Sequence, residues 1–340
     1  MANIYDVARE SGFSTATVSK VFNHYAGVNA ITKAKVLESA KRCGYIPNVQ
    51  NSDTVKKKSW LIGVFYKESI GIGFTHPHFG EILQSFKETI EAAGYELIFF
   101  NNNYSNSRFS YVEHCQFRNV DGVLIVDGSI PPREAADMES NGYKCVSLEN
   151  YYTDIPTIIS NNTAGTIQAL NYLYTLGHRK IAMIAELDSN SNKERFKAYK
   201  TFLKQKHIPY RENLVTFCDG YSFEAYKAAT DKLLDQSLGD FPTGIFTTFD
   251  HIALSVQKAL LKRGYKIPND ISVIGFDDIS MAKSVTPPLT TIRQNRSGIG
   301  VRAAEILLQR LINDDEVNHT KVTRIETGLV VRNSTGRAKK

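Results

Sequence analysis

The sequence lacks a long run of apolar side chains. No stretch of its 340 residues approaches the roughly 18 consecutive apolar residues that a membrane-spanning helix needs, so we expect no membrane partner. The opening segment, MANIYDVARE, carries Asp6, Arg9 and Glu10 where a secretion signal needs an apolar block. We therefore expect a protein that is not exported and acts in the cytoplasm.

Cysteine is also scarce. The sequence has four cysteines, which are Cys43, Cys115, Cys145 and Cys218. Their wide spacing matches neither a metal site nor a redox pair, so we expect buried, reduced thiols. His76 and His78 lie close together without a supporting carboxylate or cysteine, which favours a loop surface over a metal site.

Motifs of catalysis are missing as well. The chain contains no nucleophile elbow, no phosphate-binding lysine loop and no paired carboxylates in an acid–base setting. The segment GIGVRAA, residues 298–304, has the glycine spacing of a dinucleotide site, but no strand is predicted before it and it starts a helix. We predict that the protein is not an enzyme and uses no cofactor.

Positive charge is present but unevenly distributed. Residues 1–60 contain nine Lys and Arg against four Asp and Glu, a net charge of +5. The remaining residues contain 32 against 31, a net charge of +1. A small basic segment attached to a near-neutral body is typical of a protein that binds a polyanion.

Apolar periodicity predicts three short helices in this basic segment. Ile4 and Val7 mark one face of a first helix, which Gly12 ends. Ser14 is placed to cap a second helix, and Thr32 is a candidate cap for a third. The third helix is expected to cover KAKVLESAKRC. The three helices are expected to form one compact head.

The second helix has an unusual composition. The stretch SGFSTATVSKVFN, residues 11–23, combines short hydroxyl side chains with a single lysine. Ala8, Gly12 and Val18 have the spacing of a helix-turn-helix: a small contact residue, a turn residue and a branched apolar plug. Short side chains let a helix approach the major groove of DNA, and Lys20 can reach a base edge or a phosphate. The alternative is an ordinary helical hairpin with Ser and Thr on its solvent side.

From Leu61 onward, apolar strand-like segments alternate with amphipathic helix-like segments. One series begins at LIGVFY, residues 61–66, and a second begins at KIAMIAE, residues 180–186. Apolar strands alternating with helices predict parallel sheets covered on both faces. The predicted fold is therefore an all-α head joined to an α/β body of two doubly wound lobes, with a ligand bound between the lobes at the carboxyl ends of the strands.

Five motifs then resemble one known family. In chain order they are NIYDVARESGFSTATVSKVFN, GYIPN, LGHRKIAMI, DISVIGFDD and TPPLTTIRQ. Together they resemble the lactose/galactose repressor family of bacterial transcription regulators over nearly the whole chain. The resemblance implies a body similar to periplasmic sugar-binding proteins, and it implies double-stranded operator DNA and a small effector as partners.

The resemblance also implies which head residues contact DNA. The base-contacting positions are Thr15, Ala16 and Lys20. The positions that hold phosphate or sugar are Tyr5, Ser14, Thr17, Ser19 and Asn23. Ala16 offers only a methyl group, so Lys20 and Thr15 are expected to supply the polar discrimination between bases. One head contacts too few base pairs for useful specificity, so we expect a homodimer on a palindromic operator.

The linker departs from the family pattern. Its hinge positions are Asn48, Thr54, Val55, Lys56, Lys57 and Lys58. In the family, a leucine at the end of a short hinge helix wedges into the minor groove. Thr54 and Val55 are poorer wedges than leucine, and Asp53 would lie near phosphates, although the three lysines could offset that charge. Our hypothesis is that this linker orders less on DNA, or kinks it less.

Effector-binding positions follow from the same resemblance. They are Arg195, Tyr221, Phe249, Asp250 and Asp277. The Arg195 guanidinium suits two adjacent hydroxyls, a carboxylate or a phosphate, and Asp277 suits a hydroxyl or an amine. Phe249 stands where an asparagine is common, and it can stack on a sugar ring or simply pack. The alternatives are a structural ion pair for Arg195 and Asp277 and a core role for Tyr221.

The sequence therefore predicts a ligand-responsive, operator-binding repressor of carbohydrate genes, associated with the bacterial nucleoid, with a sugar or sugar phosphate as effector. The other interpretation is a cytoplasmic sugar-binding module without operator-specific DNA binding. The terminal VVRNSTGRAKK shows no heptad pattern, so no tetramer-forming coil is expected. We expect a head over residues 1–46, a hinge over 47–59, a body over 60–335 and a basic tail over 336–340. Within the body, the lobes are expected over about 60–160 and 163–285, and the chain is expected to cross back near 286–295.

Overall fold

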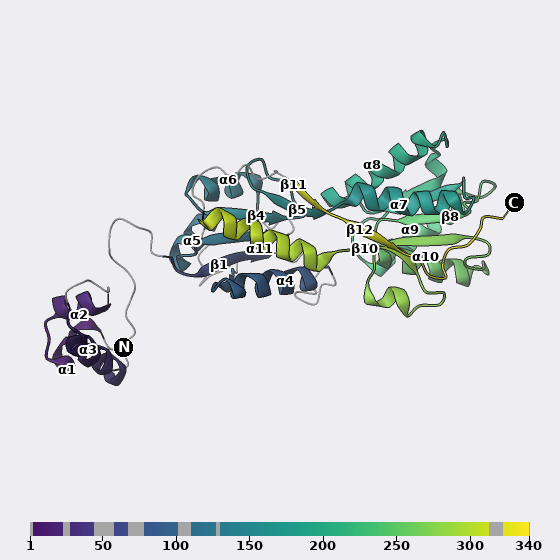
Figure 1. The fold of residues 1–340 in the computed structure, drawn as a ribbon. Coiled ribbons are helices and arrows are strands. Elements are labelled where there is room, and N and C mark those ends of the chain that lie inside the picture. The colour runs from purple at the N-terminus through teal and green to yellow at the C-terminus, as the bar shows by residue number, and fades with distance from the viewer. Residues whose placement is uncertain are drawn as a thin grey trace. The chain divides into compact units, whose positions relative to one another are not determined.

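A computed structural model describes residues 3–22, 28–43, 58–66, 78–100, 110–126, 130–312 and 322–339 (Figure 1). The chain divides into two compact units, Met1–Lys57 and Lys58–Lys340. The division lies within the segment 47–59 that the sequence assigns to a hinge. The two units are described separately.

The described residues of the first unit, 3–22 and 28–43, form three helices. They are α1 (Ile4–Ser11), α2 (Thr15–Phe22) and α3 (Ala30–Cys43). Their shared core consists of Val7, Val18, Val21, Val36 and Ala40. The valines of all three helices meet because each helix places its branched side chains on one face.

Capping side chains set the helix ends of this unit. Gly12 has a φ of 75° and ends α1 by donating its N–H to the Ala8 carbonyl. The Ser14 hydroxyl accepts the Thr17 N–H at 3.2 Å, as predicted for the start of α2. The prediction for α3 is wrong, because the helix starts at Ala30 and the Asn29 side chain accepts the Thr32 N–H at 2.7 Å.

The second unit contains two six-stranded sheets. The first, the N-lobe sheet, has the order β11-β5-β4-β3-β1-β2, and all its pairs are parallel. Its strands are β1 (Leu61–Tyr66), β2 (Glu96–Phe99), β3 (Gly122–Val126), β4 (Lys144–Leu148), β5 (Thr157–Ser160) and β11 (Val322–Ile325). The helices packed on it are α4 (Phe79–Ala92), α5 (Tyr111–Arg118), α6 (Pro132–Ser140) and α11 (Arg296–Ile312).

The second sheet, the C-lobe sheet, has the order β12-β10-β9-β8-β6-β7. Its strands are β6 (Ile181–Ala185), β7 (Val215–Phe217), β8 (Gly244–Thr247), β9 (Ser272–Asp277), β10 (Thr290–Gln294) and β12 (Thr327–Val330). Only the β10–β12 pair is antiparallel. The α-helices of this lobe are α7 (Asn162–Thr175), α8 (Asn190–Gln205), α9 (Phe223–Gln236) and α10 (Asp250–Lys262).

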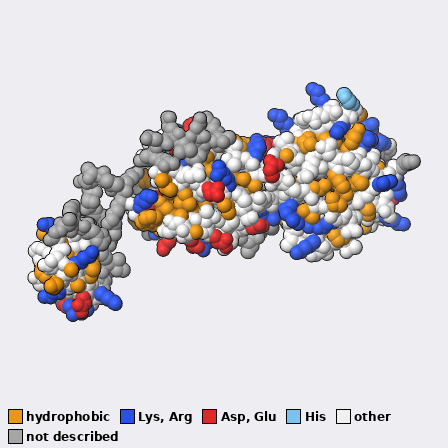
Figure 2. Space-filling model, viewed as in Figure 1, with side chains coloured by type: hydrophobic (Ala, Val, Ile, Leu, Met, Phe, Trp, Pro, Cys, Tyr) orange, Lys and Arg blue, Asp and Glu red, His pale blue; other side chains and the backbone are white. Residues whose placement is uncertain are grey.

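Each sheet is apolar on both faces. In the N-lobe, Val64 and Leu124 pack toward α4 and α11, whereas Val123 and Ile125 belong to the cluster under α5 and α6. Alternate residues of one strand thus enter two different cores. The predicted architecture of two doubly wound lobes is confirmed. Figure 2 shows that apolar side chains also reach the surface of both lobes, among Lys and Arg.

The chain crosses between the lobes three times, after β5, after β10 and after β11. The sequence predicted a single return near 286–295. The difference arises because helix α11 packs beside α4 in the N-lobe, and β11 pairs with β5 there before β12 returns to the C-lobe (Figure 1). Amphipathic periodicity predicts that a helix is half buried but does not say which lobe buries it.

Gly300 of GIGVRAA serves this helix packing. A side chain at Gly300 would meet the Ile82 carbonyl, the Ser85 hydroxyl and the Phe86 nitrogen of α4. Contrary to the prediction, strand β10 does precede this segment, ending at Gln294. The close approach of α11 to α4 gives Gly300 a structural explanation, whereas a side chain at Gly298 would meet the side chain of Asn295.

The C-terminal residues run along the C-lobe. Val273 donates its N–H to the Ser334 carbonyl at 2.8 Å, and the Ser334 hydroxyl donates to the Val273 carbonyl at 2.6 Å. Ala338 donates its N–H to the Leu176 carbonyl at 2.9 Å. Residues 336–339, predicted as the start of a separate tail, are therefore part of the lobe. Within the described parts of the chain, no helix combines the length and apolar character required to span a bilayer.

Candidate DNA-binding surface and effector site

Helix α2 presents a polar face opposite its apolar one. Val18 and Val21 are buried, whereas Ala16 and Lys20 are exposed and Thr15 is partly exposed. The positions i and i+4 of a helix lie on one face, so Ala16 and Lys20 share the outward side. This face carries two of the three residues predicted to contact bases, and Thr15 lies at the start of the helix, partly exposed.

The predicted phosphate contacts are only partly placed by the structure. Tyr5 on α1 is 72% exposed. The hydroxyls of Ser14 and Thr17 lie 3.0 Å apart and hydrogen bond to each other, and Ser19 is partly exposed. Asn23 lies outside the described residues, as do the hinge positions Asn48, Thr54, Val55, Lys56 and Lys57. The remaining hinge position, Lys58, places its Nζ 5.4 Å from the centre of the Trp60 ring.

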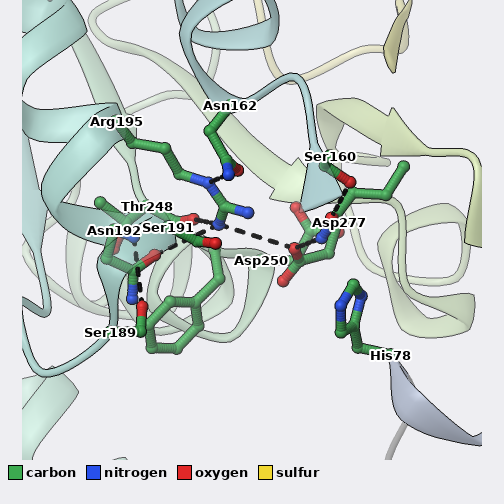
Figure 3. A network of polar contacts seen from close by, with 12 residues as sticks. His78, Ser160, Asn162, Ser189, Ser191, Asn192, Arg195, Thr248, Asp250 and Asp277 are labelled. Carbon is green, nitrogen blue, oxygen red and sulfur yellow. Dashed lines mark hydrogen bonds and ion pairs between the residues drawn. The ribbon is translucent and has the colours of Figure 1, made fainter. Parts of the chain in front are cut away.

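Arg195 on α8 is the centre of a polar cluster in the body (Figure 3). Its Nε donates to Asn162 Oδ1 at 2.9 Å, and its Nη1 donates to the Thr248 carbonyl at 2.5 Å and to Asn192 Oδ1 at 3.3 Å. The guanidinium lies 3.7 Å from the centre of the Phe276 ring. These partners fix a side chain that is only 5% exposed.

Burial lowers the pKa of the Arg195 guanidinium, while the carboxylates of Asp277 and Glu149 act in the opposite direction. The Nη2 atom donates to no residue that the structure describes. The side-chain nitrogen of Asn162 is also buried without a described partner. A buried donor beside Arg195 therefore has no acceptor among the described residues, which is the arrangement expected where a ligand binds.

Asp277 faces Arg195 from the end of β9. Its Oδ1 lies 3.8 Å from Arg195 Nη1 and accepts Gln294 Nε2 at 2.6 Å. Gln294 in turn accepts the Ser160 hydroxyl at 2.5 Å. Ser160 ends β5 and Gln294 ends β10, which are two of the crossing strands. The chain of contacts in Figure 3 therefore joins the Arg195 cluster to the segments between the lobes.

Asp250, which the sequence predicts to bind effector, lies in the interior of the C-lobe. Asp250 is fully buried, its Oδ1 accepts the Thr291 hydroxyl at 2.6 Å, and its Oδ2 accepts the Ile279 N–H at 2.9 Å. Burial and the nearby charge of Asp277 raise the pKa of its carboxyl. Asp250 therefore joins the start of α10 to the segment that follows β9 and to β10.

The two predicted aromatic residues stack on each other. The rings of Tyr221 and Phe249 lie 5.9 Å apart at 21°, and Tyr226 contacts Phe249 edge-on at 5.4 Å. Phe249 belongs to the C-lobe core, so the packing alternative describes it well. Tyr221 is 38% exposed and donates its hydroxyl to Glu186 Oε2 at 2.5 Å.

Sequence reasoning missed two carboxylates near this cluster. Glu186 follows β6 and accepts Asn192 Nδ2 at 2.7 Å as well as the Tyr221 hydroxyl. Glu149 follows β4 and accepts the Ser191 hydroxyl, one turn before Arg195 on α8. Both were visible as acidic residues directly after predicted strands, in KIAMIAE and KCVSLE, where ligands bind in open α/β sheets.

His78 is not on a loop surface, contrary to its prediction. It directly precedes α4, its side chain is mostly buried, and its Nε2 lies 3.3 Å from Glu149 Oε1. Burial raises the pKa of the Glu149 carboxyl, but the hydrogen bonds from His78 and Ser191 and the charge of Arg195 outweigh it and lower the pKa overall. His76 lies outside the described residues. In the part of the chain that is described, no three His, Cys, Asp or Glu side chains form a group able to hold a metal ion.

Sequence comparison identifies both units. Residues 3–48 match the profile of bacterial regulatory proteins of the lacI family, and residues 170–335 match that of the periplasmic binding protein-like domain. The transcriptional repressor PurR of Vibrio atlanticus is 33% identical over 325 residues, which cover 93% of each chain. The protein belongs to the lacI family. Such relatives are transcriptional regulators rather than enzymes, and this lacI-family protein is likewise a DNA-binding transcriptional regulator with an effector-binding body.

Solved structures of lacI-family proteins share the fold. The lac repressor dimer bound to operator and the anti-inducer ONPF is 26% identical, with a TM-score of 0.77 over 98% of this chain and 99% of that one. A complex of the regulator CelR with cellobiose is 25% identical, with a TM-score of 0.68 over 98% and 100%. The helix-turn-helix head and the two-lobed body of this lacI-family protein thus have direct structural counterparts.

Proposed function

We propose that the protein is a homodimeric repressor that acts in the bacterial cytoplasm, binds a palindromic operator through α2, and responds to a sugar or sugar phosphate held between its lobes. The observation that carries the proposal is the Arg195 cluster. The Asn162 amide beside the buried guanidinium leaves a donor without an acceptor among the described residues, and the Asp277 carboxylate lies 3.8 Å from Arg195 Nη1. A ligand rich in hydroxyls satisfies such donors and acceptors together.

The lobes supply the response. Arg195 and Asp277 belong to the C-lobe, whereas Glu149 and His78 belong to the N-lobe. A ligand that contacts both sets changes the relative stability of the lobe arrangements, and operator affinity changes by the difference in its affinity for them. Relatives bound to operator and to cellobiose support this coupling of DNA and ligand in one chain.

Two features support the dimer. Two heads related by a two-fold axis contact two half-sites, which gives a palindrome its specificity. The lac repressor structure that shares this fold is a dimer bound to its operator.

The test combines DNA selection with ligand binding. The full chain should enrich a palindromic site from random DNA, and a sugar that raises its melting temperature should change its affinity for that site. Arg195→Ala should abolish the ligand response while leaving operator binding without ligand intact. Lys197→Ala, an exposed lysine on the same helix, should leave both unchanged. Ligand binding without any preferred DNA sequence would instead identify a sugar-binding module.

A further inference from the structure

The carboxylates around Arg195 outnumber the cations. Asp277 and Glu149 are mostly buried, with side chains 15% and 11% exposed, and Glu186 is fully buried. Each carboxylate accepts a hydrogen bond from a neighbouring side chain: Gln294 at Asp277, Ser191 at Glu149 and Tyr221 at Glu186. Asp277 and Glu149 act directly on the Arg195 guanidinium, and Glu186 is joined to it through Asn192.

The other charged groups do not reverse this balance. Arg296 lies 3.5 Å from Glu81 Oε2, and its second contact is the backbone carbonyl of Asp277, so Glu81 offsets its charge. Asp250, whose pKa is raised, adds negative charge when it ionises.

Protonation of His78 would change the size of the net charge around Arg195 but would leave it negative. With His78 neutral, the three carboxylates exceed Arg195 by two charges. With His78 protonated against Glu149, one negative charge remains in excess. A phosphate or carboxylate placed at Arg195 Nη2 therefore meets a negative field in a poorly hydrated setting, where charge interactions are strong.

Glu149 has a particular position among the three carboxylates. It belongs to the N-lobe, whereas Arg195, Asp277 and Glu186 belong to the C-lobe. It is joined to α8 through the Ser191 hydroxyl, one turn from Arg195, and after Asp277 it is the main carboxylate acting on that guanidinium. Its charge is therefore brought to Arg195 when the lobes meet.

We propose that the effector carries no negative charge and is a neutral, hydroxyl-rich molecule such as a free sugar, and that Glu149 is the specificity residue that excludes phosphorylated and acidic sugars. The inference rests on the proposed function, because it concerns the same site. A hydroxyl accepts from Arg195 Nη2 and Asn162 Nδ2 and donates to a carboxylate, whereas a carboxylate or a fully ionised phosphoryl group only accepts. The site thus offers a hydroxyl both hydrogen-bond donors and carboxylate acceptors, whereas an anion without an O–H can use only the donors.

The test uses inorganic phosphate as the probe on the full chain. Melting temperatures are measured at constant ionic strength in the wild type, Glu149→Gln and the exposed N-lobe control Glu88→Gln, each with and without Arg195→Ala. Arg195→Ala separates this site from phosphate binding at the basic head. In the wild type and in Glu88→Gln, we expect phosphate to cause no rise in melting temperature that depends on Arg195. In Glu149→Gln, we expect phosphate to raise the melting temperature only when Arg195 is present, with phosphate binding at least about tenfold tighter than in the wild type.

Two results would overturn the inference. One is phosphate binding by the wild type that is lost in Arg195→Ala. This result can be obtained even if the Glu149 variant does not fold. The other is a folded Glu149→Gln that binds phosphate no better than the wild type. DNA selection on the same preparation keeps the two proposals apart, because a chain without a preferred DNA site fails the proposed function whatever phosphate does.

Discussion

The hydroxyl of Tyr151 in the N-lobe donates to Oε1 of Glu194 in the C-lobe at 2.5 Å. Arg324 of β11 donates to the same oxygen at 2.8 Å. Tyr151 is the last of three consecutive residues that contact α8. The three contacts are Glu149 with Ser191, Asn150 with Asn190, and Tyr151 with Glu194. One short segment after β4 therefore ties the lobes together beside the Arg195 cluster.

This contact predicts measurable coupling between the lobes. A double-mutant cycle of Tyr151→Phe and Glu194→Gln should give an interaction free energy of about 1 kcal/mol in thermal or urea unfolding, because a partly exposed hydrogen bond to a charged group is screened by solvent. The single variants retain their ring and their amide, so packing changes little. Strictly additive effects would show that this contact does not hold the lobes.

The approach of α11 to α4 gives a second prediction. Gly300→Ala should destabilise the N-lobe by about 1–3 kcal/mol, because the new methyl group meets backbone atoms of Ile82 and Phe86 that cannot rotate away. Gly328→Ala on β12 is the matched control, since a side chain there meets nothing within 4 Å. Equal unfolding midpoints for the two variants would contradict the close packing.

The buried carboxyl of Asp250 predicts a pH dependence. Burial raises its folded-state pKa above the unfolded value of about 3.9, so the folded protein keeps a proton that the unfolded chain has lost. The stability from this group is complete below about pH 4 and is lost as the pH rises toward the folded-state pKa. Asp250→Asn should therefore gain stability relative to the wild type as the pH rises, by up to about 1.4 kcal/mol per pH unit.

Asp240 provides a control of opposite sign. Hydrogen bonds from Arg211 and Lys180 lower the pKa of Asp240 to about 2. Its contribution is present above the unfolded pKa and is lost as the pH falls, so Asp240→Asn should lose stability relative to the wild type as the pH rises from about 2 to about 4. Urea unfolding across the pH range measures both variants. A flat difference for Asp250→Asn would contradict a raised pKa.

The sequence predicted the elements better than their connections. Strand β6 occupies Ile181–Ala185 within the predicted KIAMIAE, because a run of apolar residues between turns forms a buried strand wherever it lies. The lobe that receives α11 depends on which surface is vacant near α4, a long-range property that local periodicity does not contain. Residues 322–325 join the N-lobe sheet for the same kind of reason.

Only part of the site could be predicted, because side-chain directions also depend on information that residue identity does not contain. Asp250 and Asp277 both follow a strand, and their side-chain directions depend on backbone angles that residue identity does not specify. Asp277 adopts a φ of 124° and faces Arg195, whereas Asp250 starts α10 and faces the core. Glu149 also follows a strand, with a φ of 64°, but its role becomes visible only when the second lobe brings Ser191 to it.

The C-terminal residues give a fourth prediction. Ser334 is fully buried, donates to the Val273 carbonyl and accepts the Thr290 N–H at 2.8 Å. Ser334→Ala should cost about 1–3 kcal/mol of stability, because it leaves buried backbone groups of the C-lobe sheet without a partner. Ser140→Ala, at an exposed serine on α6, should be close to neutral. Thermal unfolding of the two variants distinguishes a structural strand from a dispensable tail.

Lys20 carries the sharpest prediction for the head. It is exposed on the outward face of α2, so a contact with a base edge would give it a share of the sequence discrimination. Lys20→Ala should then weaken binding to the selected operator by about 1–3 kcal/mol while changing binding to random DNA less. Lys41→Ala removes the same charge from an exposed position on α3 and controls for the general attraction to phosphates. If both variants weaken operator and random DNA equally at one fixed salt concentration, Lys20 contacts only the backbone, and the base discrimination of α2 must come from Thr15.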